Sequence, residues 1–173
     1  MRLRTLGLMA VVALAPAARG LAASATFALG MTGANEVLPT VGDPDGFANG
    51  TITLDDVSGM ISWNITYGNL DPTLSGFHIH GPASASQSAG ILIGLGTATT
   101  GGPGTLISSI VATPANVAQV LGNPSNFYVN IHTQGTFAGG AVRDQLGTLV
   151  PEPATAALVA CGLAAIGACR RRR

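Results

Sequence analysis

Three histidines are the side chains of this sequence with the clearest capacity for site chemistry. His78 and His80 stand two residues apart in an alternating segment, and His132 ends a second alternating segment. Residues two apart in a β-strand point the same way, so with the apolar residues turned toward a core, His78 and His80 share the outer face. The same parity places His132 on the outer face of its own strand. If the two strands are neighbours, three imidazoles meet on one patch.

A patch of three imidazoles is a candidate metal site. Neutral imidazole is a borderline ligand that suits copper, zinc or nickel, and three histidines leave a position open for water or substrate. The same parity puts Tyr128 and Asn130 beside this patch. The alternative is that the histidines are polar residues of the outer face that hydrogen-bond to loops. We therefore take His78, His80 and His132 as candidate ligands of copper or zinc and leave the alternative open.

The segments that must position these residues are short, and many of them alternate between apolar and polar residues with a period of two. Turns rich in glycine, proline and asparagine separate them. The candidate strands are residues 26–31, 50–54, 60–67, 77–80, 91–95, 106–112, 127–132 and 141–146. Residues 113–122 predict one short crossover helix, with a capping hydroxyl at Thr113, a proline at the first helical position and a glycine at the end.

This pattern predicts an all-β domain over residues 26–149. Short strands at this spacing are typical of an antiparallel Greek-key sandwich or barrel, of the superoxide-dismutase-like or immunoglobulin-like kind. The length of the segment is sufficient for a single core. Both cysteines lie outside it, so the domain is expected to have no disulfide.

The charge of this domain excludes one class of partner. Residues 26–149 carry one positive and seven negative charges, a net of −6, and the positive one is Arg143. No basic patch is available to neutralise phosphates, so nucleic acid is not expected as a partner. Glu36 lies beside turn-forming residues and is predicted to be solvated. Arg143 is predicted at a strand edge, paired with Asp144 or a loop carboxylate, with attraction of an anion toward a metal as the alternative.

The first 25 residues are predicted to be a secretory signal peptide. Two arginines precede an apolar run, and small residues in an A-x-A pattern end it at Ala25. The apolar run is too short to cross a bilayer. We expect signal peptidase to cut after Ala25.

Residues 150–173 are predicted to be a second targeting signal. Pro151, Glu152 and Pro153 precede an apolar stretch, residues 154–169, which is expected to be a helix, and four arginines end the chain. The arginines are expected on the cytoplasmic side of a membrane that the apolar helix enters, so the domain faces outward. This arrangement resembles the PEP-CTERM sorting signal of Gram-negative bacteria. The resemblance implies recognition and cleavage by an exosortase, and delivery to the cell surface or extracellular matrix.

The domain itself resembles the CHRD (chordin-type) family. The resemblance is carried by the segments Gly-Phe-His-Ile-His-Gly-Pro-Ala, Phe-Tyr-Val-Asn-Ile-His-Thr and Gly-Ala-Val-Arg-Asp-Gln-Leu, at residues 76–83, 127–133 and 140–146. The last segment departs from the family pattern, since Ala141 replaces a glutamate and Asp144 a glycine, while Arg143 is retained. The family implies an extracellular β domain of largely unassigned biochemistry.

The Phe-His-Ile-His-Gly segment is also similar to the copper-ligand strand of copper/zinc superoxide dismutases. Those enzymes need four copper histidines and further zinc ligands, whereas this chain has three histidines in total. The full two-metal site of that family is therefore excluded.

These observations favour an exported, non-enzymatic domain with a binding or structural role at the cell surface. Surface polysaccharide or a matrix protein would be its partner, and no nucleophile–base pair is recognisable in the sequence. The first alternative is a three-histidine copper or zinc protein that serves in copper buffering or redox defence. A second is an adhesive that associates with itself through exposed strand edges.

Overall fold

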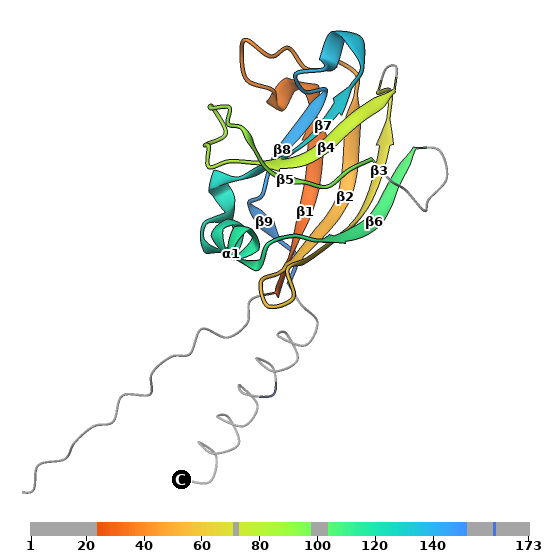
Figure 1. Ribbon diagram of the computed structural model, residues 1–173. Helices are drawn as coiled ribbons and strands as arrows, with labels where there is room; N and C mark the ends of the chain where they lie inside the picture. Colours follow the sequence, from red (N-terminus) through yellow and green to blue (C-terminus); the bar gives the residue numbers. More distant parts are fainter. Residues whose placement is uncertain (1–23, 71–72, 98–103, 152–160, 162–173) are drawn as a thin grey trace, which may run out of the picture.

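The computed structural model describes residues 24–70, 73–97, 104–151 and 161. Within these ranges, nine strands form one antiparallel sheet that curls around its core (Figure 1). In chain order the strands are β1 (Ser24–Thr32), β2 (Phe47–Asp55), β3 (Met60–Gly68), β4 (Leu74–His80), β5 (Ile91–Gly94), β6 (Thr105–Val111), β7 (Tyr128–Thr133), β8 (Val142–Gln145) and β9 (Thr148–Leu149). One α-helix, α1 (Pro114–Gly122), and three short 3-10 turns, η1 (Gly33–Asn35), η2 (Pro124–Asn126) and η3 (Gly135–Phe137), complete the described elements.

The order of strands across the sheet is β5-β4-β7-β8-β1-β2-β3-β6, and β9 pairs with β1. Helix α1 carries the chain from β6 at one edge of the sheet to β7 in its interior, as the predicted crossover requires. All pairings are antiparallel. The predicted all-β architecture with one short helix is confirmed.

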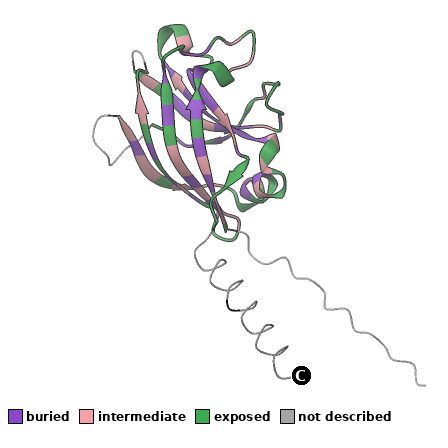
Figure 2. Ribbon diagram, turned by 180° about the vertical axis from the view of Figure 1, so that it is seen from behind, coloured by how far each residue is buried: buried purple, intermediate pink, exposed green. Residues whose placement is uncertain are grey.

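Alternating apolar residues turn one face of the sheet inward. Along β3, Ile61, Trp63 and Ile65 are buried while the residues between them are exposed or half-buried (Figure 2). Trp63 of β3 stands opposite Ile52 of β2, which is also buried. The period-two pattern that predicted this strand is therefore the pattern that buries it.

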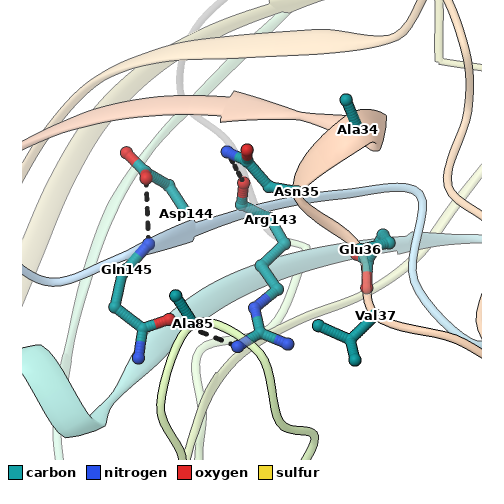
Figure 3. Close-up of a pocket in the computed structure, with 8 residues that line it drawn as sticks. All are labelled: Ala34, Asn35, Glu36, Val37, Ala85, Arg143, Asp144 and Gln145. Carbon is teal, nitrogen blue, oxygen red and sulfur yellow. Dashed lines mark hydrogen bonds between the residues drawn. The ribbon is translucent and has the colours of Figure 1, made fainter.

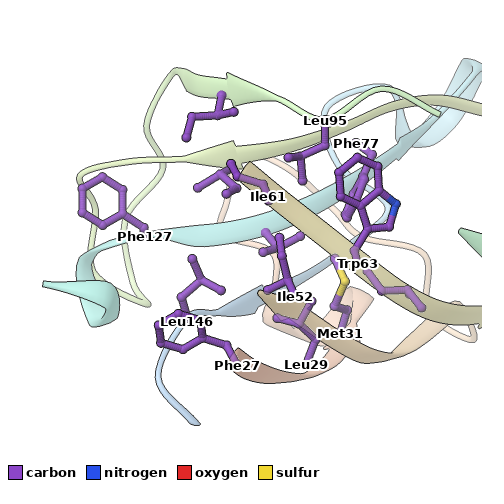
Figure 4. Packing of buried hydrophobic residues seen from close by; sticks show 14 of the residues in the cluster. Phe27, Leu29, Met31, Ile52, Ile61, Trp63, Phe77, Leu95, Phe127 and Leu146 are labelled. Atoms are coloured by element: carbon purple, nitrogen blue, oxygen red, sulfur yellow. The ribbon is translucent and has the colours of Figure 1, made fainter. Parts of the chain in front are cut away.

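The curl of the sheet brings its two halves together over one core. The rings of Trp63 on β3 and Phe77 on β4 meet edge to face, with centroids 5.5 Å apart. Four other strands separate β3 from β4 in the order of the sheet, so this contact closes the core across the curl (Figure 4). Truncating an aromatic side chain in such a position costs about 3–5 kcal/mol.

Helix α1 covers one end of this core with Val117 and Val120, both of which are buried. It begins at Pro114, which needs no hydrogen-bond partner for its nitrogen at the first helical position. The predicted side-chain cap by Thr113 was wrong, because its hydroxyl makes no capping hydrogen bond.

The two ends of the domain lie together. The backbone nitrogen of Val150 donates to the carbonyl of Thr26 at 2.8 Å. Strand β1 begins at Ser24, and Ala25 pairs with Leu54, so the predicted cut after Ala25 would remove the first two residues of this strand and leave the rest.

Most residues of the two predicted targeting signals lie outside the part of the chain that the structure describes. This holds for residues 1–23 of the signal peptide, for Glu152 and Pro153, and for the stretch 154–169 apart from Cys161, which is helical and exposed. Pro151, the last residue described in continuity with the domain, is exposed. Among the described residues, no helix has the length and apolar character needed to cross a membrane.

Candidate metal centre

The three histidines lie on two neighbouring strands. Strands β4 and β7 pair antiparallel, with His80 opposite Tyr128, His78 opposite Asn130 and Gly76 opposite His132. The predicted adjacency of the two strands is confirmed, and so is the parity. The apolar residues between the histidines face the core, and all three imidazoles stand on the outer face.

The imidazoles converge within the reach of a single ion. One ligand atom from each of His78, His80 and His132 lies within 4.8 Å of the other two. The Nε2 atoms of His80 and His132 are 3.3 Å apart. The centroid of the His78 ring is 5.5 Å from that of His80 and 4.9 Å from that of His132.

Backbone carbonyls fix the tautomers of two of these rings. Nδ1 of His80 is 3.0 Å from the carbonyl oxygen of Ala89, and Nδ1 of His132 is 3.1 Å from that of Ala138. A carbonyl oxygen only accepts hydrogen bonds, so both Nδ1 atoms carry the proton and donate it. Each neutral ring then has its lone pair on Nε2. The two Nε2 lone pairs face each other at 3.3 Å, where only a shared proton or a metal ion turns repulsion into attraction.

Burial keeps the three rings neutral. The pKa of His80 is lowered to about 4. Desolvation is the main cause, the hydrogen bond to Ala89 acts in the opposite direction, and the neighbouring His132, His78 and Arg143 contribute to the lowering. Desolvation also lowers the pKa of His78 and of His132. At neutral pH the cluster therefore presents unprotonated nitrogens, the form that binds metal.

The position of His78 depends on the glycine two residues before it. A Cβ atom at Gly76 would lie 2.5 Å from Cε1 of the His78 ring. Gly76 stands opposite His132, so the space above it is the space through which His78 reaches the other two rings. A glycine here makes room for the third imidazole.

The third ring has no carbonyl to orient it. Nδ1 of His78 is buried and has no hydrogen-bond partner among the residues that the structure describes, and the same is true of Oδ1 of Asn130, the residue directly opposite on β7. The Asn130 side chain also interacts with the carboxyl group of Glu36 and lowers its pKa. The two unpartnered atoms are a potential donor and an acceptor on adjacent strands, which makes Asn130 a candidate orienting residue for His78.

A stack of three side chains lies behind His80. The Tyr128 ring is parallel to the His80 ring, with centroids 4.9 Å apart and planes at 7°. Cζ of Arg143 lies 3.4 Å from the centroid of the same Tyr128 ring. The Tyr128 ring therefore stacks with both the His80 imidazole and the Arg143 guanidinium. The cation–π attraction of the ring stabilises the guanidinium at a place where water is excluded.

The loop at residues 81–90 covers this stack. The Tyr128 hydroxyl accepts from the nitrogen of Ala89 and donates to its carbonyl. Nη2 of Arg143 donates to the carbonyl of Ser84 at 3.1 Å, and Nε2 of Gln145 donates to that of Ala83 at 2.7 Å. The alternative role predicted for the histidines, hydrogen bonding to loops, is present for His80 and His132. The cover over Tyr128 and Arg143 was not predicted. The loop binds these side chains mainly through backbone carbonyls, which every residue has. The sequence therefore contained no signal that this loop covers the outer face.

Two charged residues differ from their predicted places. Arg143 is 1% exposed rather than at a strand edge. Of its two predicted partners, Asp144 instead accepts hydrogen bonds from the nitrogens of Gly30 and Gln145, whereas the loop carboxylate of Glu36 does interact electrostatically with Arg143 (Figure 3). Glu36 is half-buried rather than solvated, and desolvation raises its pKa to about 7, against the lowering effects of Arg143 and Asn130. The turn-forming residues next to Glu36 gave no sign that its carboxyl group would be half-buried.

Comparison with known proteins identifies the family of the domain. A family model described as the CHRD domain matches residues 27–146. The chain belongs to the CHRD domain family. No curated protein and no solved structure matched it.

In this CHRD domain, the three segments that carried the sequence resemblance form one unit. Residues 76–83 span the end of β4 and the start of the covering loop, residues 127–133 form β7, and residues 140–146 contain β8. Strands β4, β7 and β8 are consecutive in the sheet. These three segments thus converge on the face that holds the histidines and Arg143.

Proposed function

We propose that this CHRD domain binds one transition-metal ion through His78, His80 and His132, with zinc as the ion that best fits the geometry. The observation that carries the proposal is the pair of facing Nε2 atoms of His80 and His132, 3.3 Å apart, each with its Nδ1 held by a carbonyl. Metal-binding histidines characteristically donate their second nitrogen to such a partner.

The separation of these atoms distinguishes between coordination geometries. With bonds of about 2.05 Å, two nitrogens 3.3 Å apart subtend roughly 107° at the ion, close to the tetrahedral angle. In square-planar copper(II), the same bonds would place neighbouring nitrogens about 2.9 Å apart and opposite nitrogens about 4.1 Å apart, so 3.3 Å fits neither. A ligand atom of His78 lies within 4.8 Å of the others, and its Nδ1 has no hydrogen-bond partner among the described residues, so a turn of the ring toward the ion would break no hydrogen bond of that atom.

The proposed ion would have one position left for water or a small anion. The proposed ligand set has no carboxylate, so a bound divalent ion would keep its full charge. The positive charge of Arg143, which lowers the pKa of His80, also opposes a cation at the same place. Affinity below that of a zinc-finger site is therefore expected.

The proposed setting of this site is the cell surface. The predicted signal peptide up to Ala25, and the sorting signal at Pro151, Glu152 and Pro153 with the apolar stretch 154–169, support export of the domain and processing by signal peptidase and an exosortase. There the domain would serve as a non-enzymatic binding or matrix component. Cell fractionation tests this, with surface exposure expected for the natural chain and retention expected when Pro151–Pro153 is replaced by alanines.

Equilibrium dialysis tests the metal site, using the full chain purified without a histidine tag. We expect one zinc ion per chain. His132→Ala should lower the affinity for zinc by about 100-fold or more, because only two of the three proposed ligands remain. Asn64→Ala, an exposed residue of β3, is the matched control and should bind as the natural chain does. Absence of stoichiometric binding of zinc and copper, or binding that His132→Ala leaves unchanged, would overturn the proposal.

A further inference from the structure

Exposed apolar side chains gather at the end of the domain where β1 begins and β9 ends (Figure 1). Ser24, the first residue of β1, stands opposite Asp55 at the end of β2, so the turn between β2 and β3 lies at the same end. Five of the nine large hydrophobic residues that are exposed in the described ranges lie here. We call these five residues the apolar end: Val57, Met60, Val111, Leu149 and Val150.

Three members of the apolar end form one group beside the turn between β2 and β3. Met60 at the start of β3 stands opposite Val111 at the end of β6, and Val57 lies in the turn itself. The nitrogen of Ala112 donates to the carbonyl of Gly59 at 2.9 Å, which ties the end of β6 to this turn. The three side chains are 48–72% exposed, so each presents much of its apolar surface to the surroundings.

The other two members lie on the far side of β1. Leu149 of β9 stands opposite Phe27 of β1, and Val150 follows it. Strands β9, β1, β2, β3 and β6 are neighbours in that order, so at about 4.8 Å per strand the two groups stand roughly 19 Å apart. Two apolar groups at this separation form a broad support that fits a surface better than a pocket.

The chain leaves the domain at the same end. The nitrogen of Val150 donates to the carbonyl of Thr26 at 2.8 Å, and residues 151–153 alone separate it from the apolar stretch 154–169, which the sequence predicts to enter a membrane. Three residues span at most about 11 Å when fully extended. With that stretch in a bilayer, the apolar end is therefore held within about 11 Å of the lipid surface.

The opposite end of the domain provides a comparison. Leu38 and Val41 are also exposed, at 80% and 66%, but they lie in the loop that follows β1 (Figure 1). Strand β1 has nine residues and is about 30 Å long, so this loop is far from the point where the chain leaves. Hydrophobicity alone does not distinguish the two ends, whereas the connection to residues 154–169 does.

Charge determines which lipid surface fits the apolar end. Asp55 and Asp56 lie in the turn beside Val57, and Arg143, the one arginine or lysine among the described residues, is buried elsewhere. Anionic lipids repel such an end, whereas zwitterionic phospholipids do not. The apolar contact is small and would be weak for a free domain, but the short connection raises its effective concentration at the membrane.

We propose that the apolar end rests on a zwitterionic phospholipid surface while residues 154–169 anchor the chain. The domain then stands with the loop of Leu38 and Val41 turned away from the membrane. This inference rests on the export setting of the proposed function and is independent of the metal site.

Paramagnetic relaxation enhancement of the ¹⁵N-labelled full chain tests this, in phosphatidylcholine nanodiscs that carry a spin label on some headgroups. We expect the strongest enhancement at residues 57–60, 110–112 and 148–150, and none at residues 36–42. Val57→Asp combined with Met60→Asp should lower the enhancement at residues 110–112 and 148–150 at least twofold. Leu38→Asp combined with Val41→Asp is the matched control and should leave it unchanged. Nanodiscs of phosphatidylglycerol should also lower it.

Four results would overturn the proposal. These are equal enhancement at the two ends of the domain, stronger enhancement at residues 36–42, no effect of the Val57 and Met60 double variant, and stronger contact with phosphatidylglycerol. Val111→Asp repeats the test if the double variant does not fold. A chain that does not enter the nanodiscs would overturn the membrane stretch together with this proposal. A chain that enters them without the expected contrast would overturn the docking alone.

Discussion

The outer face of the sheet has two halves. Both follow the same alternation of inward and outward side chains, but one half is open and the other is covered by loops. Across β1, β2, β3 and β6, its residues are mainly serine, threonine and asparagine, as in the row formed by Thr26, Thr53, Ser62 and Ser109. They are exposed or half-buried. Across β4, β7 and β8 the outward side chains are larger and more polar, and most of them are covered. His80, Tyr128, Asn130 and Arg143 are all buried there.

The covered half also holds most of the hydrogen-bonding capacity that the domain leaves unused. Six buried side-chain atoms in the described ranges have no partner, and four of them belong to Glu36, His78, Asn130 and Arg143. Folded proteins tolerate few such groups, and each has a free-energy cost. Their concentration on one half of one face is the clearest physical difference between the covered and the open half.

The largest contrast between the halves is expected from removing the buried cation. Arg143→Ala would take away the partner of the Tyr128 ring and leave the carbonyl of Ser84 and Oε1 of Gln145 unpaired. We expect a loss of about 2–4 kcal/mol in the free energy of unfolding. Thr66→Ala on the open half should change it by less than about 0.5 kcal/mol. Urea unfolding measures both, and equal effects would contradict the comparison.

The covered half should also determine the response of the apo protein to acid. The folded-state pKa of His80, about 4, lies below its unfolded value of 6.5, so its contribution to stability is present above pH 6.5 and is lost as the pH falls toward 4. The lowered pKa values of His78 and His132 act in the same direction. The raised pKa of Glu36, about 7, acts oppositely, because its contribution is present below 4.5 and is lost as the pH rises through 7.

Two variants should separate these opposing effects by about 1–3 kcal/mol. Between pH 6.5 and 4.5, Glu36→Gln should lose stability more steeply than the natural chain, and His80→Gln less steeply. The midpoint of urea unfolding at several pH values, after removal of metal by a chelator, gives the three profiles. Parallel profiles would show that neither group titrates in the way its burial implies.

A smaller effect compares two strand glycines. Gly76→Ala would press on the His78 ring and should weaken zinc binding by about tenfold or more while the fold remains. Gly30→Ala, in β1, meets no atom closer than 3.9 Å and should leave zinc affinity unchanged. Calorimetric titration of both variants measures the difference. If Gly76→Ala binds zinc as tightly as Gly30→Ala, His78 is not a ligand.

The sequence alone predicted the elements of this face well. The eight strands that were expected from alternation are present, and the parity of His78, His80 and His132 is as expected, because a period of two leaves no freedom once the apolar residues face the core. The pairing of β4 with β7 could only be assumed as a condition. It depends on the path of the whole chain, including the crossover through α1.

The cover over the histidines could not be predicted in the same way. Ala89 and Ala138 fix the tautomers of two rings through their carbonyls, and nothing in their identity distinguishes them from other loop alanines. Glu36 and Arg143 looked like surface charges in the sequence, because their burial is caused by loops that fold back onto the sheet. Alternation identifies an outer face, but only the loops decide whether it meets water.

X-ray absorption at the zinc edge of the untagged chain, loaded with one equivalent of zinc, tests the metal centre most directly. The account predicts a four-coordinate ion with three imidazole nitrogens at about 2.0–2.1 Å, and loss of one imidazole in His80→Ala. A spectrum of an ion surrounded only by water and carboxylate oxygens, or one that His80→Ala leaves unaltered, would contradict it.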